Sequence, residues 1–254
     1  MTKEKEYILL LDSATEICSV ALGKTDGTIV AKREEITPNK HSELLAPFAD
    51  ELLGKLPGAI KDHLRSVVIS EGPGSYTGLR IGASYAKGLC WTLGIPLVTV
   101  PSTEALALNF LENAELDEIL DKELDSSDAL LLPMIDARRM EVYTAIYDTA
   151  GRIIPESEIK ALILTKDEDL SYLKERLQNK RVYLFGSGAT KAVEPIENLL
   201  GKAQVTFTDG ITIGAAGMLK RGLEKLSKDE TVDVGYWTPF YLKEFQATTP
   251  KKKY

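Results

Sequence analysis

The sequence has few of the residues that build metal centres and disulfide frameworks. Its 254 residues include two histidines and two cysteines. Cys18 and Cys90 lie within apolar patterns and lack the spacing of metal ligands, and there is no His-Glu-x-x-His motif. These absences argue against a zinc peptidase and against a secreted domain held by disulfides. They fit a chain that works in a reducing cytoplasm.

Excess basic charge and long apolar runs are also missing. The chain has 31 Lys and Arg against 38 Asp and Glu, a net charge of -7. Because phosphate neutralisation supplies most of the affinity for nucleic acid, such a chain is a poor nucleic-acid binder by itself. No apolar run approaches the ~20 residues of a membrane-spanning helix. The apolar run near the first residue is too short for a signal peptide, so we expect a cytoplasmic chain that does not contact a membrane.

Hydrophobic residues make up 44% of the chain, enough for a substantial core. Apolar periodicity and turn residues predict the element order β-β-β-α-β-α-β-α in the first half. The second half again opens with strands joined by short turns and then alternates helix and strand. The expected strands are 7–12, 17–22, 28–34, 66–70, 95–100, 130–136, 141–147, 152–155, 181–185 and 204–207. The expected helices are 41–53, 103–112, 166–179, 191–200 and 212–226, together with one that is capped by Ser75 or Thr77 and runs to about Leu93.

This order predicts an α/β fold of two lobes, each a mixed β-sheet with flanking helices, as in actin-like ATPases (the ASKHA fold). We expect a first lobe over residues 1–112, to which the family resemblance described below assigns dimerisation, and a second lobe over 113–208. Residues 209–254 would form a helix that returns towards the first lobe and an extended tail.

The stretch Ser66–Pro101 is expected to form a strand, a glycine turn, a helix and a second strand. Within its helix, Gly78, Gly82 and Ala86 are four residues apart and therefore share one face. A face of such small side chains predicts close approach of another element. That element could be the sheet of its own lobe or a second subunit, and the pattern leaves both open.

Two turns are weak candidates for binding phosphate. Actin-like ATPases use an Asp at the end of the first strand and a turn of Gly, Ser and Thr for this purpose. Here the corresponding residues are Asp12, Ser13 and Thr15, although the Cβ of Ala14 hinders close approach of the backbone. The second candidate turn is Gly186, Ser187 and Gly188. A purely structural role as a turn explains each of the two segments about as well as phosphate binding does.

Three other features have structural interpretations that we favour over catalytic ones. His41 stands at a helix start, where a histidine is usually a capping or solvated residue. Ser75 follows a glycine turn, but its surroundings are not a G-x-S-x-G nucleophile motif. Arg138-Arg139 could bind RNA phosphate or a carboxylate, and an exposed turn with ion pairs is the favoured interpretation.

Several segments together resemble one known family. They are LLLDSATEICSVAL, HSELLAPFADELL, GPGSYTGLRIGASYAKGL, GIPLVTVPSTEALA and PMIDARRMEVYTAIYD. They are similar to the bacterial TsaB (YeaZ-like) family, which acts in tRNA threonylcarbamoyladenosine biosynthesis and is a non-catalytic paralogue of TsaD. The resemblance is dense from Leu9 to about Asp148. Near the end, PFYLK is similar to the family pattern P-x-Y-L-R, with lysine in place of arginine.

The resemblance implies a scaffold or activating subunit with no catalytic or metal-binding residues of its own. It implies pairing with TsaD, recruitment of the ATPase TsaE by that pair, a homodimer when alone, and contact with tRNA only through the complex. No intrinsic cofactor is expected, and ATP or ADP would bind only in the assembled complex. The family pairs through its first lobe, which implies an interface at Leu44, Leu45, Phe48, Leu52, Gly78, Gly82 and Ala86.

The metal-binding His-x-x-x-His pair of the catalytic paralogue aligns by strand ends with Ser102 and Leu106 here, neither of which can hold a metal. An alternative function from another class is an independent ATPase or kinase that uses Asp12. A third is the peptidase activity once ascribed to this superfamily, which the missing metal ligands oppose.

Overall fold

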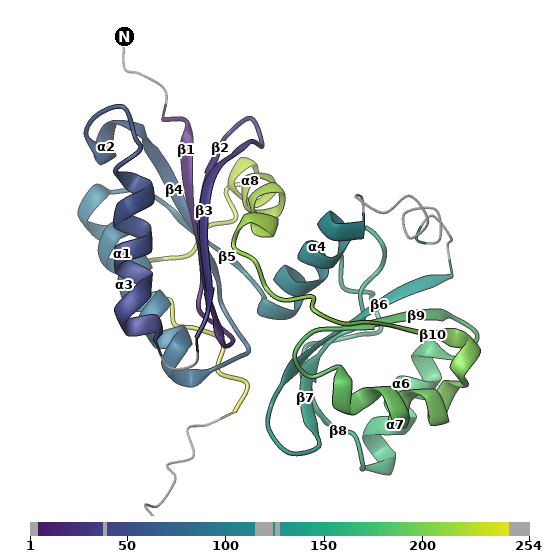
Figure 1. The fold of residues 1–254 in the computed structure, drawn as a ribbon. Coiled ribbons are helices and arrows are strands. Elements are labelled where there is room, and N and C mark those ends of the chain that lie inside the picture. The colour runs from purple at the N-terminus through teal and green to yellow at the C-terminus, as the bar shows by residue number, and fades with distance from the viewer. Residues whose placement is uncertain (1–4, 38–39, 115–123, 125–127, 244–254) are drawn as a thin grey trace, which may run out of the picture.

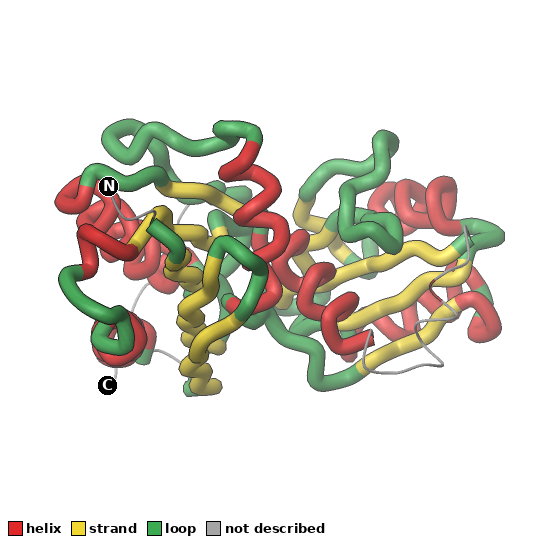
Figure 2. Tube along the Cα trace, turned by 90° about the horizontal axis from the view of Figure 1, so that it is seen from above, coloured by secondary structure: helices red, strands yellow, loops and turns green. Residues whose placement is uncertain are grey.

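The computed structural model describes residues 5–37, 40–114, 124 and 128–243. Two lobes lie side by side, each built on a five-stranded sheet (Figures 1 and 2). The first sheet has the order β3-β2-β1-β4-β5. Strand β1 pairs antiparallel with β2 and parallel with β4. The strands are β1 (Tyr7–Asp12), β2 (Ile17–Lys24), β3 (Ile29–Ile36), β4 (Leu64–Ser70) and β5 (Leu97–Val100).

The second sheet repeats this topology. Its order is β10-β9-β6-β7-β8, so β6 takes the central place of β1, with β7 antiparallel on one side and β9 parallel on the other. The strands are β6 (Ala129–Asp136), β7 (Glu141–Thr144), β8 (Lys160–Ile163), β9 (Arg181–Phe185) and β10 (Val205–Thr208). The expected two-lobed α/β fold is therefore confirmed.

Side-chain alternation in β1 explains how the first sheet is covered on both faces. Leu9 and Leu11 pack in a core with Leu45 and Leu52 of helix α1 (His41–Leu53). The intervening residues, Ile8 and Leu10, belong to the core on the other face, which contains residues of α4 (Ser102–Ala114) and Leu219 of α8 (Leu219–Ser227). Helix α3 (Tyr76–Leu93) lies beside α1, and the short α2 (Ile60–His63) precedes β4 (Figure 1).

The second lobe has its own helices, α6 (Asp167–Leu177) and α7 (Val193–Leu200), on one face of its sheet (Figure 1). Short 3-10 turns occupy Thr190–Ala192, Lys202–Gln204 and Ala216–Met218. Within the described residues, no helix has the length and apolar content needed to cross a membrane.

Two predicted elements were wrong in detail, and one strand was not predicted. Strand β8 was missed, and the strand expected at 152–155 is reduced to a single bridge between Tyr147 and Ile153. The helix expected from 212 begins at Leu219, because Gly214 and Gly217 fit closely against Asn109 before it. Of the expected second lobe, residues 115–123 and 125–127 lie outside the described residues.

Helix α8 packs on the first lobe. A Cβ atom at Gly222 would lie 2.6 Å from Cγ2 of Val68, so the helix backbone lies directly against β4. Lys225 Nζ donates to the carbonyl oxygen of Thr99 at 2.8 Å, and Val232 bridges to Leu97. The chain beyond α8 then continues along the first lobe towards the space between the lobes (Figure 1).

Candidate functional site

The carboxyl ends of the central strands of both sheets face one cleft between the lobes, as is usual for ligand sites in α/β folds. The cleft has a volume of about 810 Å³. The first lobe contributes the turn after β1 and the starts of α1 and α3. The second lobe contributes the turn after β6 and Ser187, and the C-terminal segment adds residues 240–243.

Asp12, at the end of β1, is fully buried below this cleft. Its Oδ1 accepts hydrogen bonds from the hydroxyl of Ser70 and, at 3.3 Å, from the amide of Ala14. Its Oδ2 has no hydrogen-bond partner among the described residues. Burial raises the pKa of Asp12 to about 7, against the lowering effect of these hydrogen bonds.

The start of α3 covers the turn after β1. The Ser75 amide donates to the Ala14 carbonyl at 2.6 Å, and the Ser13 hydroxyl donates to the Gly78 carbonyl at 2.9 Å. A Cβ atom at Gly74 or Gly78 would overlap the carbonyl oxygen of Ala14 or Ser13, respectively. Because α3 occupies the space above these groups, a phosphate has no direct approach to Asp12 or Ser13.

The small face of α3 is turned inward, which corrects part of the expected interface. A Cβ atom at Gly82 would overlap the Ser13 hydroxyl, and Ala86 has no exposed surface. Gly78, Gly82 and Ala86 therefore pack within their own lobe, out of reach of a partner. Leu45 and Leu52 of α1 are likewise buried in the core.

The outward side of the same two helices has a different composition. Leu44 and Phe48 of α1 are half-buried, as expected for surface positions beside a core. The Tyr85 hydroxyl lies 3.4 Å from Oδ1 of Asp50 and links α3 to α1. We call the outward positions Leu44, Phe48, Ile81, Ser84, Tyr85 and Gly88 the outer face. A Cβ atom at Gly88 would have no neighbour within 4 Å.

On the second-lobe side, the turn after β6 has an unusual backbone. Arg138 and Arg139 have φ values of 69° and 48°, in the left-handed region that non-glycine residues rarely adopt. The turn is held by Lys191, which pairs with Asp136 and donates to the Arg139 carbonyl at 2.8 Å. This is the exposed, ion-paired turn that the sequence favoured, and it places Arg138 at the cleft.

The second glycine turn is shaped mainly by packing. A Cβ atom at Gly186 would overlap the Met134 carbonyl, and one at Gly188 would lie 2.9 Å from Cγ1 of Val142. Ser187 accepts a hydrogen bond from the Asp136 amide at 3.1 Å and lines the cleft, as Thr15 does from the first lobe. The two predicted turns thus meet at one cleft, and phosphate binding there stays a prediction.

Comparisons with known proteins agree on one family. The family model described as TsaD: tRNA N6-adenosine threonylcarbamoyltransferase matches residues 29–208. A TsaB protein of Bacillus subtilis, named for tRNA threonylcarbamoyladenosine biosynthesis, is 32% identical over 243 residues, which are 94% of this chain and 95% of that protein. The chain belongs to the TsaB family. The Escherichia coli TsaB is 28% identical over 240 residues, covering 93% and 94% of the two chains.

A solved structure shows the same fold. YeaZ from Pseudomonas aeruginosa superposes with a TM-score of 0.71 at 22% identity, covering 93% of this chain and 100% of that one. The resemblance of the sequence to the TsaB (YeaZ-like) family is thereby confirmed.

Two features of this TsaB-family site were missed from the sequence. His41 is neither a cap nor solvated: it is buried, and its Nε2 lies 3.1 Å from the Ile17 carbonyl oxygen. Residues 240–243, expected only as a surface tail, form one wall of the cleft. The pattern Pro239-Phe240-Tyr241 was the available signal, since exposed tails seldom combine proline with two aromatic residues.

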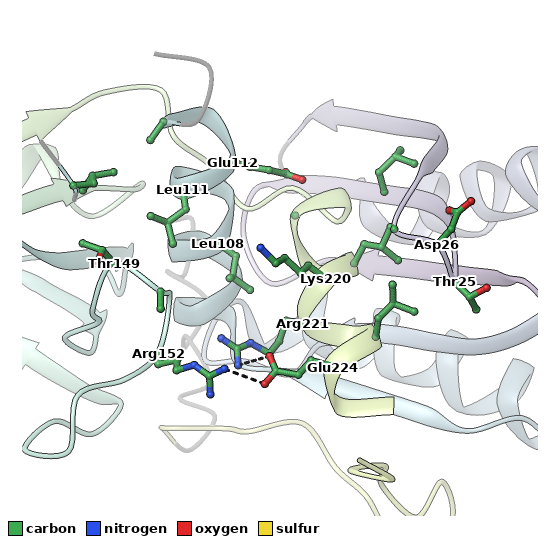
Figure 3. Close-up of a pocket in the computed structure, with 18 residues that line it drawn as sticks. Thr25, Asp26, Leu108, Leu111, Glu112, Thr149, Arg152, Lys220, Arg221 and Glu224 are labelled. Carbon is green, nitrogen blue, oxygen red and sulfur yellow. Dashed lines mark hydrogen bonds and ion pairs between the residues drawn. The ribbon is translucent and has the colours of Figure 1, made fainter. Parts of the chain in front are cut away.

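A second cavity, of about 700 Å³, lies on another side of the lobe junction (Figure 3). The β2–β3 turn, α4, the turn at 149–152 and α8 surround it. Two of its arginines share one carboxylate: Glu224 contacts both Arg152 and Arg221 at 3.1 Å. Arg221 also contacts Glu104 of α4, outside the cavity lining, at 2.7 Å. These pairs join α8 to the second lobe and to α4. In the described part of the chain, no group of three His, Cys, Asp or Glu side chains could hold a metal ion.

Proposed function

We propose that this chain is a non-catalytic subunit in tRNA threonylcarbamoyladenosine synthesis, which pairs with the catalytic TsaD paralogue through the outer face. The observation that carries the proposal is membership of the TsaB family over nearly the whole chain. In this proposal the pair recruits the ATPase TsaE, and tRNA reaches the chain only as part of the complex. All of these steps would take place in the cytoplasm.

The closed turn after β1 supports a role without catalysis. Helix α3 occupies the space through which a nucleotide phosphate would approach Asp12. Ser102 and Leu106, at the positions aligned with the metal-binding histidines of the paralogue, are both buried. Leu106 belongs to the hydrophobic core, and Ser102 accepts a hydrogen bond from the Gly72 amide at 3.0 Å. Both side chains therefore have structural roles in the fold.

The outer face is suited to a helix-to-helix contact. Small residues at Ser84 and Gly88 allow another backbone to approach, and Leu44, Phe48 and Tyr85 supply half-buried apolar surface around them. A few such anchors carry most of the energy of a typical interface. Without the paralogue, the same face would form a two-fold homodimer.

A second candidate function, an ATP-dependent enzyme, is kept because Thr15 of the first lobe and Ser187 of the second both line a cleft of nucleotide size. If the chain is instead the non-catalytic subunit, ATP or ADP would bind only in the assembled complex. Calorimetry with ATP and magnesium on the purified chain separates the two: robust binding that is lost in Thr15→Ala would favour the enzyme.

Co-purification with the TsaD paralogue tests the pairing. Gly88→Arg adds a long charged side chain where the chain itself leaves open space, so it should abolish co-elution on a sizing column without unfolding the monomer. Ser171→Arg, at an exposed position on α6 of the second lobe, is the matched control and should co-elute normally. Normal co-elution of Gly88→Arg would show that the interface lies elsewhere.

A further inference from the structure

Exposed aromatic rings and cations gather at the mouth of the interlobe cleft. The ring of Tyr241 lies 4.9 Å from that of Tyr76, measured between centroids, and the planes are tilted by 42°. The Arg80 guanidinium lies 5.5 Å from the Tyr76 ring. Phe240 and Tyr241 are 38% and 37% exposed. Single exposed apolar residues are common on protein surfaces, whereas a cluster of partly exposed rings beside a cleft is typical of a binding surface.

The backbone beneath these rings is fixed. The Phe240 amide donates to the Glu71 carbonyl at 2.7 Å, and Lys87 Nζ donates to the Trp237 carbonyl at 2.7 Å. A Cβ atom at Gly72 would lie 2.5 Å from the Phe240 carbonyl oxygen, so the segment fits directly over a glycine. Because the segment is already ordered, a ligand that stacks on it pays little additional entropy.

Further cations stand on the second-lobe side of the same mouth. Arg138 and Lys243 both line the cleft with Tyr143. Burial raises the pKa of Tyr143; the charges of Lys243 and Arg138 oppose that rise, and the charge of Glu141 adds to it. Lys243 also pairs with Glu141. The cleft mouth therefore presents aromatic rings with Arg80 on the first-lobe side and Arg138 and Lys243 on the second-lobe side, near the lining carboxylates of Glu16 and Asp136.

We propose that Tyr76, Arg80, Arg138, Phe240, Tyr241 and Lys243 form a docking surface for unpaired RNA nucleotides. Bases stack on the rings of Phe240 and Tyr241, and backbone phosphates contact Arg80, Arg138 and Lys243. Aromatic platforms beside basic side chains are the usual means of holding single-stranded nucleic acid. The inference rests on the proposed function and goes beyond it: there, tRNA reaches the chain only as part of the complex, whereas here the chain has RNA contacts of its own.

The net charge of -7 does not oppose such a local surface. It removes the long-range attraction that would make the whole chain a nucleic-acid binder, and so it predicts weak binding by the isolated subunit. Stacking is less sensitive to net charge, so single strands should bind better than a duplex of the same length.

Fluorescence anisotropy of a labelled single-stranded RNA octamer with the purified full chain tests this surface at low salt. Tyr241→Ala should weaken binding about tenfold, in the range of one lost base stack. Arg138→Ala should reduce the slope of log affinity against log salt by about 0.7, the share of one phosphate contact on a single strand. The matched controls are Tyr236→Ala, an exposed tyrosine of the same segment, and Lys202→Ala, an exposed lysine of the second lobe.

Equal affinity of wild type and Tyr241→Ala for the octamer, or equal loss in Tyr236→Ala, would overturn the proposal. If Tyr241→Ala binds RNA normally and instead loses co-elution with the TsaD paralogue, the surface is a protein interface and the proposal is also overturned. The outcome is separable from the pairing proposal, because Gly88→Arg should still bind the octamer as wild type does.

Discussion

At the scale of single residues, Asp12 should make stability depend on pH. Its pKa is raised to about 7 in the folded chain by burial, against about 4 for an unfolded aspartate. The folded state therefore holds a proton that the unfolded state releases, and stability should fall as pH rises from about 4 to 7. Asp12→Asn cannot ionise and should unfold at about the same denaturant concentration throughout this range.

The size of this effect follows from the shift. Three pKa units correspond to at most ~4 kcal/mol of unfolding free energy. The unfolding free energy of Asp12→Asn should therefore be about 2–4 kcal/mol higher than that of wild type at pH 8, and equal to it near pH 4. Urea unfolding at both pH values gives the comparison. A variant less stable than wild type at pH 8 would mean that the ionised carboxylate makes a stabilising interaction.

Individual side chains also show which contacts sequence patterns cannot predict. The turn residues Ser13, Thr15 and Ser187 were weak candidates for phosphate binding, and Thr15 and Ser187 line the cleft. The sequence could not show that Ser13 would donate its hydrogen bond to Gly78, because that contact joins residues 65 positions apart.

At the scale of elements, α1 was predicted with its observed bounds, while the sequence allowed α3 to begin after a cap at either Ser75 or Thr77; the structure has Ser75, whose hydroxyl accepts from the Gly78 amide at 3.3 Å. The inward side of α3 was not predictable from spacing. Gly78, Gly82 and Ala86 form one row of small residues at intervals of four, and Ser84 and Gly88 form another. Only the approach of the β1–β2 turn decides which row is buried.

Replacement of glycine by arginine should have opposite effects on stability in the two rows of α3. Gly82→Arg drives a side chain into Ser13 and Ile69 and should cost more than ~3 kcal/mol of unfolding free energy, or prevent folding. Gly88→Arg meets open space and should be neutral or gain up to ~0.8 kcal/mol, because glycine is a poor helix former. Thermal unfolding by circular dichroism measures both, and similar melting temperatures would contradict the assigned orientation of α3.

At the scale of the whole molecule, element order was sufficient to predict two lobes of one fold, because each lobe repeats the same sequence of strands and helices. The arrangement at the lobe junction was not predictable, since it depends on contacts between distant segments. Arg221 of α8 illustrates this point: it pairs with Glu104 of α4 and donates to the Gly151 carbonyl of the second lobe at 3.2 Å.

Removing Arg221 should weaken this junction. Both side chains of the Arg221–Glu104 pair are mostly buried, 11% and 14% exposed, so Arg221→Met leaves a carboxylate without its cation. We expect a loss of about 3–5 kcal/mol in urea unfolding. The double variant with Glu104→Gln removes the orphaned charge and should recover most of the loss. Equal losses in the single and double variants would show that packing, and not charge, holds the junction.

The most direct test of the central claim is threonylcarbamoyl transfer to tRNA, measured with the TsaD paralogue, TsaE and this chain. Wild type and Asp12→Asn should support equal rates, while omission of the chain or its replacement by folded Gly88→Arg should abolish transfer. Full activity with Gly88→Arg, or loss of activity in a folded and paired Asp12→Asn, would contradict a non-catalytic subunit that acts through the outer face.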